Sequence, residues 1–121
     1  MPLLGTLIPV RGIYHITCLT NGKVYIGKSS NVLARLLNHT EKLVVGKHDI
    51  KSLQKDFDDC GIECFSFGII TECPREETLD TESKIIANLR VAGIELYNRT
   101  KEGFLAVYTL SRDEEERCQI I

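Results

Sequence analysis

Alternating hydrophobic and polar positions near the beginning of the chain predict a β-hairpin. Residues 12–18 (GIYHITC) and 23–28 (KVYIGK) are rich in β-branched and aromatic side chains, which favour strands. The link between them contains Asn21-Gly22, and such a pair between two strand-like runs is the strongest short-range signal for a hairpin. We therefore expect two antiparallel strands here.

Apolar residues spaced three and four positions apart predict a helix over about residues 31–45. Its beginning can be capped by Ser29, Ser30 or Asn31. Arg35, His39 and Lys42 follow one another at steps of four and three residues, so they form a narrow polar stripe. This stripe lies beside the expected apolar face, which consists of Val32, Leu33, Leu36, Leu37, Leu43 and Val44.

The remaining pattern predicts two more helices and a third strand. A second helix covers about residues 49–60 and ends at Gly61, which suits a left-handed cap. Residues 63–72 alternate as a strand, and a third helix covers about residues 74–91. A short extended piece follows at residues 96–98. The order ββααβα defines a small α+β domain with a short, mostly antiparallel sheet flanked by helices.

One carboxylate interrupts the apolar face expected for the third helix. Glu82 lies near the middle of that face, which is formed by Leu79, Ile85, Ile86 and Leu89. A buried carboxylate is costly unless a cation or several donors meet it. A structural ion pair would explain Glu82, and a solvated helix flank would explain Arg35 and His39. Together, however, an acid for a metal ion and an arginine for a phosphate are the minimum parts for phosphodiester hydrolysis.

Two short motifs connect these residues with a known family. Gly12-Ile13-Tyr14, followed after ten residues by Tyr25-Ile26-Gly27, resembles the signature of GIY-YIG endonucleases. The resemblance covers about residues 11–99, and residues 46–64 are most similar to the homing-type and phage-encoded branch. It continues in the family's order with Arg35, His39, His48, Glu82 and Asn98.

The resemblance implies a chemical role for each matched side chain. Tyr14 would be the base that activates water, and Tyr25 would complete the hydrogen-bond network. A free tyrosine has a pKa of about 10, so nearby cations must favour the phenolate. Arg35 would stabilise charge on the phosphate oxygens, and His39 would position water or phosphate or relay a proton. Glu82 would bind a single Mg²⁺ or Mn²⁺ ion.

Further matched residues would support this set. Asn98, counted here with the catalytic residues, would tie the site together by hydrogen bonds. Gly12 and Gly27 would be structural, and Gly27 would let the backbone approach closely. We assign DNA contacts to Lys28, Lys42 and His48, although His48 also suits an exposed position at the beginning of the second helix.

The charge distribution only partly supports a DNA enzyme, because the net charge is −2. Residues 11–56 hold eight Lys and Arg against three Asp and Glu, a balance of +5. Residues 57–82 hold one against eight, a balance of −7, and the remainder is neutral. This asymmetry is compatible with one face meeting phosphates, or with a mixed solvated surface.

Length and composition suit one domain with two short flanks. We divide the 121 residues into an N-terminal extension (1–10), a GIY-YIG nuclease domain (11–99) and a C-terminal tail (100–121). In the tail, the acidic residues 112–117 predict a frayed or partner-dependent helix. The tail shows no zinc finger or helix-turn-helix pattern, so target recognition would come from a partner subunit, a homodimer or further chain.

The cellular setting follows from what the sequence lacks. No apolar run approaches the roughly 20 residues needed to cross a bilayer, and no secretory signal is visible. Five cysteines, an odd number, argue against a disulfide framework. We therefore expect an intracellular protein, in the cytoplasm or nucleoid, without membrane contact.

Three other interpretations are open. Residues 22–29 satisfy the phosphate-loop pattern GxxxxGK[ST], but their Val-Tyr-Ile centre favours a strand over a phosphate nest. Cys60, Cys64 and Cys73 lack a CxxC pair and a nearby histidine, so buried thiols fit better than zinc. The main alternative is a non-catalytic GIY-YIG-like module that binds DNA or protein. The acidic balance favours that module, whereas the complete set of Tyr, Arg, His, Glu and Asn favours the endonuclease.

Overall fold

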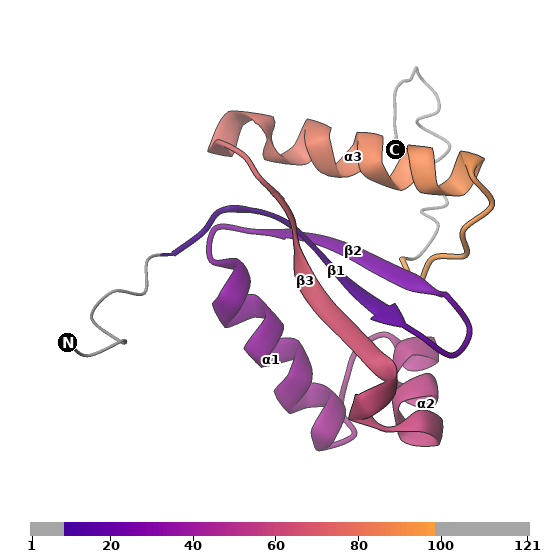
Figure 1. The fold of residues 1–121 in the computed structure, drawn as a ribbon. Helices are drawn as coiled ribbons and strands as arrows, with labels where there is room; N and C mark the ends of the chain where they lie inside the picture. The colour runs from indigo at the N-terminus through magenta and orange to yellow at the C-terminus, as the bar shows by residue number, and fades with distance from the viewer. Residues whose placement is uncertain (1–8, 99–121) are drawn as a thin grey trace.

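The computed structural model describes residues 9–98, which form a three-stranded antiparallel sheet between helices (Figure 1). The strands β1 (Gly12–Cys18), β2 (Val24–Ser29) and β3 (Phe65–Glu72) lie in the order β2-β1-β3, so β1 is central. Figure 1 shows α1 and α2 on one side of this sheet and α3 on the other. The predicted α+β class and the order ββααβα are confirmed. The helices are α1 (Val32–Val44), α2 (Lys51–Cys60) and α3 (Arg75–Val91).

The predicted hairpin is present, with residues 19–23 as its connection. The Gly22 amide donates to the Cys18 carbonyl at 2.8 Å, and the Cys18 amide donates to the Lys23 carbonyl at 2.9 Å. Gly22 has a φ of 78°, a region that glycine enters without strain. The Asn21 side chain accepts from the Lys23 amide, so the polar residues of the turn satisfy its backbone.

Helix α1 begins as predicted, but it buries a different face. Asn31 caps it by accepting a hydrogen bond from the Ala34 amide at 3.2 Å. The buried row consists of Val32, Leu36, His39 and Leu43, with Leu36 half-buried. The predicted face was therefore partly wrong, because its side chains are exposed at three positions: Leu33 (49%), Leu37 (61%) and Val44 (65%). His39 occupies the middle of the buried row because its ring finds hydrogen-bond partners there.

Gly61 ends α2 in a conformation that suits glycine, with φ 87° and ψ 169°. The positive φ agrees with the prediction, but the extended ψ differs from the left-handed helical cap that we expected. A short 3₁₀ turn, η2 (Ile62–Cys64), comes next. Strand β3 therefore begins at Phe65 rather than at residue 63.

Helix α3 has a narrower apolar face than predicted. Ile85, Ile86 and Leu89 are half-buried, whereas Leu79 is 63% exposed and does not belong to that face. Leu79 instead lines an open hollow near the beginning of the helix. The Glu82 side chain is only 15% exposed, so it lies on the inner side of α3.

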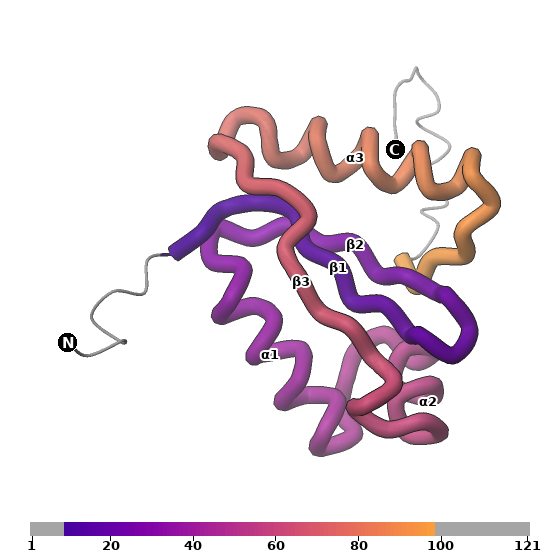
Figure 2. Tube along the Cα trace, in the orientation of Figure 1, coloured from indigo at the N-terminus to yellow at the C-terminus, as the bar shows by residue number. Residues whose placement is uncertain are grey.

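The hydrophobic core lies between the sheet and the first two helices. Its buried members are Ile16, Cys18, Leu43, Leu53, Phe65 and Tyr97. The extended piece predicted at residues 96–98 joins the domain through a parallel bridge between Leu96 and Val24. The tube in Figure 2 follows the chain from α3 back to this edge of the sheet.

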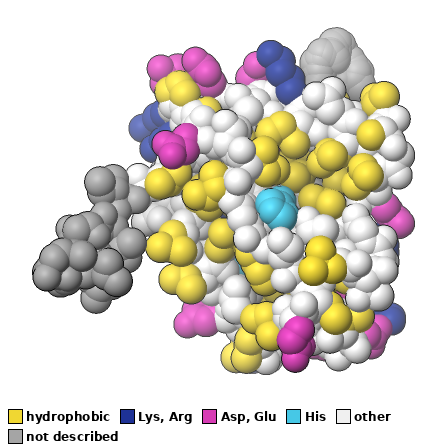
Figure 3. Space-filling view, viewed as in Figure 1, with side chains coloured by type: hydrophobic (Ala, Val, Ile, Leu, Met, Phe, Trp, Pro, Cys, Tyr) yellow, Lys and Arg dark blue, Asp and Glu magenta, His cyan; other side chains and the backbone are white. Residues whose placement is uncertain are grey.

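The view in Figure 3 shows apolar side chains over much of one face, with charged groups mainly at its rim. Among residues 9–98, no helix is long and apolar enough to cross a bilayer. The tail helix predicted at residues 112–117 and residues 1–8 of the predicted N-terminal extension lie outside the described part of the chain.

Candidate active site

Two tyrosines from neighbouring strands face α1 side by side. Tyr14 is paired with Gly27 across β1 and β2, and Tyr25 is paired with Ile16 two residues further along β1. The two rings are tilted by 47°, with their centroids 6.1 Å apart. A Cβ atom at position 27 would overlap the Tyr14 ring, so glycine is required there. The expectation that Gly27 permits close approach thus has a specific reason, because the Tyr14 ring occupies the space.

His39 reaches this tyrosine pair from α1. Its Nε2 atom lies 2.7 Å from the Tyr14 hydroxyl, and its ring centroid lies 5.4 Å from that of Tyr25. The side chain is buried, at 8% exposure. Helix α1 therefore delivers an imidazole to the buried side of the tyrosines, whereas the sequence had placed His39 in a stripe beside the apolar face.

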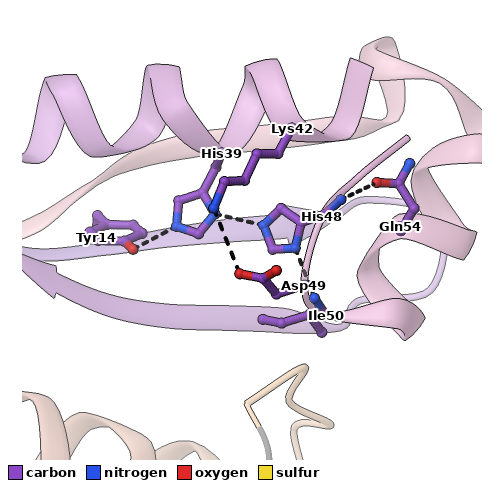
Figure 4. Close-up of polar contacts among 7 residues, drawn as sticks. All are labelled: Tyr14, His39, Lys42, His48, Asp49, Ile50 and Gln54. Carbon is purple, nitrogen blue, oxygen red and sulfur yellow. Dashed lines mark hydrogen bonds and ion pairs between the residues drawn. The ribbon is translucent and has the colours of Figure 1, made fainter. Parts of the chain in front are cut away.

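Behind His39 lies a second imidazole, which extends the hydrogen-bond chain (Figure 4). His39 Nδ1 lies 2.7 Å from His48 Nε2, and the two rings are stacked with centroids 5.0 Å apart. The Ile50 amide donates to His48 Nδ1 at 3.1 Å. The His48 amide donates to Gln54 Oε1 at 3.0 Å, so the loop that carries His48 is held at both its backbone and its ring.

The Ile50 amide assigns the proton positions along this chain, because a backbone N–H can only donate. His48 Nδ1 must then be an acceptor, and the His48 proton lies on Nε2 and is donated to His39 Nδ1. The His39 proton in turn lies on Nε2 and is donated to the Tyr14 oxygen. The chain therefore points one N–H bond at the Tyr14 oxygen.

Both histidines are neutral near pH 7. Burial, followed by the nearby His48 and the Arg35 cation, lowers the pKa of His39 to about 4. Burial also lowers the pKa of His48, although the Asp49 carboxylate opposes this shift. A neutral pair can hold the alternating donor and acceptor pattern, whereas a protonated imidazole would donate at both nitrogens and break it.

Burial and the nearby Arg35 cation shift the pKa values of the two tyrosines in opposite directions. Burial raises the pKa of Tyr14 well above its usual value, Tyr25 raises it further, and the Arg35 cation opposes the shift. Burial likewise raises the pKa of Tyr25, which also experiences the Glu82 carboxylate and the Arg35 guanidinium. Arg35, from α1, therefore influences both tyrosines, and Glu82, from α3, influences Tyr25.

Lys28 lies at the charged edge of the site. Its Nζ atom is 3.5 Å from Glu82 Oε1, and its side chain is 45% exposed. The ion pair that the sequence left open for Glu82 is therefore present. It does not exclude a role for Glu82 in the site, because the same carboxylate also influences Tyr25.

Asn98 supports the site through the backbone of the YIG segment. Its side-chain oxygen accepts from the Ile26 amide at 2.9 Å, and its side-chain nitrogen donates to the Ile26 carbonyl at 2.7 Å. The amide thus makes, at the outer edge of β2, the two hydrogen bonds that a neighbouring strand would make. Both polar ends of Asn98 face the backbone, so the geometry gives it a positioning role rather than the chemical role with which it was counted.

The assignment of His48 to DNA binding was wrong. Its side chain is buried, at 4% exposure, because the ring is stacked on His39 and bonded to the Ile50 amide. Lys42 remains half-exposed and forms an ion pair with Asp49 at 3.6 Å. Gly12 proves structural, because a Cβ atom there would overlap the Thr71 carbonyl where β3 shifts register.

Sequence reasoning did not single out Gln54, the residue that holds the His48 loop. Gln54 is buried at 8% exposure, and its Nε2 atom also donates to the Leu43 carbonyl at 3.0 Å. Its signal was a polar residue four positions after Ile50 and next to Leu53, on the apolar side of α2. The same kind of irregularity drew attention to Glu82.

The family profile of the GIY-YIG catalytic domain matches residues 10–98. The chain belongs to the GIY-YIG family. It is a GIY-YIG nuclease, a hydrolase of phosphodiester bonds. No curated protein sequence matches it.

Solved GIY-YIG structures resemble this one. The catalytic domain of the homing endonuclease I-TevI superimposes with a TM-score of 0.64 at 26% identity, covering 74% of this chain and 99% of that one. A glutamate-to-alanine variant of the I-TevI catalytic domain gives 0.62 at 27% identity, covering 71% and 90%. The predicted similarity to the homing-type, phage-encoded branch is thereby confirmed.

GIY-YIG nucleases generally depend on a divalent metal ion. Within residues 9–98, no group of three or more His, Cys, Asp or Glu side chains could enclose an ion. Mg²⁺ is usually held by one or two carboxylates together with waters and substrate phosphates. The single, largely buried carboxylate of Glu82 suits this arrangement.

Proposed function

We propose that this GIY-YIG domain is a metal-dependent endonuclease that cleaves DNA, with Tyr14 as the general base. The observation that carries this proposal is the chain of hydrogen bonds that ends on the Tyr14 oxygen, beside the charges of Arg35 and Glu82. The likeness to the catalytic domain of a homing endonuclease supports it.

In the proposed reaction, water attacks the phosphorus atom while the Tyr14 phenolate removes a proton from that water. A new oxygen–phosphorus bond forms and the bond to the 3′ oxygen breaks. The products are a 5′-phosphate and a 3′-hydroxyl, which takes its proton from solvent. Tyr14 must lose the same proton to solvent before the next cycle.

Two side chains favour the Tyr14 phenolate against the effect of burial. Burial works against it, but the His39 N–H donates to the Tyr14 oxygen and Arg35 supplies a positive charge. Tyr25 completes the pair from the neighbouring strand. Arg35 also stabilises the charge that develops on the phosphate oxygens.

Glu82 would hold the divalent ion, Mg²⁺ or Mn²⁺, together with water and a substrate oxygen. When bound, such an ion stabilises negative charge on the phosphate and the leaving oxygen. Lys28 is close enough to Glu82 to limit the negative charge of the site before the ion and DNA arrive.

Two wider proposals accompany this function. The net charge of −2 gives little general attraction to DNA, so a partner subunit or a homodimer would provide target recognition. The cysteines among the described residues are free thiols, which suits an intracellular location.

The test is cleavage of supercoiled plasmid and branched DNA in Mg²⁺, Mn²⁺ or EDTA. We expect metal-dependent nicking that is lost in Glu82→Ala and Tyr14→Phe. Glu76→Ala is a matched control, because it removes an exposed acid from the same helix. Nicking that survives in Glu82→Ala, or that proceeds equally in EDTA, would contradict the proposed mechanism.

A further inference from the structure

A hollow of about 280 Å³ lies next to the candidate site and is lined by basic and hydroxyl side chains. Its polar lining comes from Arg11, Lys28, Ser29, Ser30, Arg75 and Thr78. Three positive charges therefore face one concave surface of a chain whose net charge is −2. Such a local excess of cations beside hydroxyl donors is suited to a phosphate group.

Three chain segments build this hollow: the beginning of β1, the end of β2 and the beginning of α3. Figure 2 shows these ends on the same side of the domain. The Cys73 amide donates to the Arg11 carbonyl at 3.1 Å, which ties β1 to the chain entering α3. The Val32 amide donates to the Val10 carbonyl at 2.9 Å, which ties the same end of β1 to α1. The backbone that carries Arg11 is therefore held from both sides.

The two arginines are available for a ligand. Among the described residues 9–98, neither Arg11 nor Arg75 forms an ion pair with a carboxylate. Arg75 is exposed and Arg11 is half-buried. Glu76 and Glu77 follow Arg75 on α3, but neither lines the hollow.

The hollow connects directly with the site through Lys28 and α3. Lys28 lines the hollow and lies 3.5 Å from Glu82. Thr78, which also lines it, lies four residues before Glu82 and hence on the same side of α3. A phosphate in the hollow would therefore lie beside the phosphate that is cleaved.

We propose that Arg11, Lys28 and Arg75, with the hydroxyls of Ser29 and Ser30, form a second phosphate site that holds a DNA backbone phosphate next to the scissile one. This inference rests on the proposed DNA endonuclease function. The site fixes the position of the strand on the enzyme, because contacts to phosphates set register without reading bases. It also supplies local attraction that the overall charge does not provide.

The test compares binding and nicking of duplex DNA by the wild type, Arg11→Ala, Arg75→Ala and the double variant at several salt concentrations. Lys51→Ala is the control, because Lys51 is an exposed cation at the first position of α2, as Arg75 is for α3. Removal of one cation that contacts a phosphate should reduce the magnitude of the slope of log K against log salt concentration by about 0.9. We expect KM to rise several-fold for each arginine while kcat at saturating DNA changes little.

Each outcome has a distinct meaning. Arginine variants that match Lys51→Ala in salt slope and KM would overturn the second phosphate site while leaving the nuclease function intact. A wild type that neither binds nor nicks DNA would contradict both proposals. A titration with inorganic phosphate separates free phosphate from a DNA ligand. Saturation by phosphate, together with unchanged DNA binding in the double variant, would overturn the assignment to DNA.

Discussion

The Tyr14 ring lies against Gly27, its cross-strand partner, and fills the space that a side chain at position 27 would need. Two motif residues, one from each strand of the hairpin, therefore form a single unit. Its consequence is that the Tyr14 ring lies close to the β2 backbone while its hydroxyl reaches His39. A substitution at position 27 therefore tests whether activity depends on the position of the Tyr14 ring.

Gly27→Ala should displace the Tyr14 ring and thereby its hydroxyl. We expect stability to fall by about 1–3 kcal/mol, as is usual for overpacking. A displacement of about 1 Å from the reacting position should lower kcat about 100-fold. Denaturant unfolding and plasmid nicking measure the two effects. Gly68→Ala is a matched strand control, because its Cβ atom would lie 3.2 Å from the flexible end of His15. Equal activity of the two variants would show that the ring position does not matter.

The direction of the histidine chain predicts which substitutions at position 39 retain activity. His39→Gln keeps an N–H donor for the Tyr14 oxygen, whereas His39→Leu removes it. We therefore expect the glutamine variant to retain much more activity than the leucine variant. His48→Leu should act indirectly, with a loss of about 10- to 100-fold, a range seen for groups that orient a functional ligand.

A pH profile distinguishes this positioning role from a packing role. Loss of the His39 donor should shift the rise of kcat toward higher pH, because the phenolate becomes harder to form. A His39→Leu variant with lower kcat but an unshifted profile would indicate that His39 only supports packing.

The lowered pKa of His39 predicts that acid destabilises the fold. In the unfolded chain this group titrates near its ordinary value of 6.5, but in the folded protein its pKa is about 4. Between these values the unfolded state binds one more proton, so the free energy of unfolding falls as pH is lowered from 6.5 to 4. The contribution reaches at most about 3 kcal/mol. Denaturant titrations of wild type and His39→Gln across this window measure it, and parallel curves would refute the prediction.

Asn98→Ala should weaken the edge of β2, because it leaves the Ile26 amide and carbonyl without their partner. We expect a loss of about 1–3 kcal/mol in unfolding free energy, the usual cost of an unsatisfied buried group. Hydrogen exchange at the Ile26 amide should accelerate as well. Asn38→Ala, at an exposed position on α1, is the control. If its exchange and stability match those of Asn98→Ala, the proposed support of β2 is wrong.

The residue sequence alone determined the hairpin, the helices and most members of the site. Tyr14 and Tyr25 lie on adjacent strands, and the strand period and the Asn-Gly turn are local properties that a sequence displays. Glu82 stood out because a carboxylate on an expected apolar face needs a partner. Arg35 and His39 followed from helical spacing and from the family motif.

Only the tertiary structure decided what each of these side chains faces. His39 was expected on the flank of α1 but lies in its buried row, and His48 was expected at the surface but lies in the interior. Both rings can be buried because each provides a hydrogen-bond partner for the other. Arg75 belongs to an acidic stretch of the sequence, yet it joins Arg11 and Lys28 across three segments. Periodicity records which residues share a face of one element. It does not contain the distances between elements, and those distances decide hydrogen bonding, burial and the summation of charge.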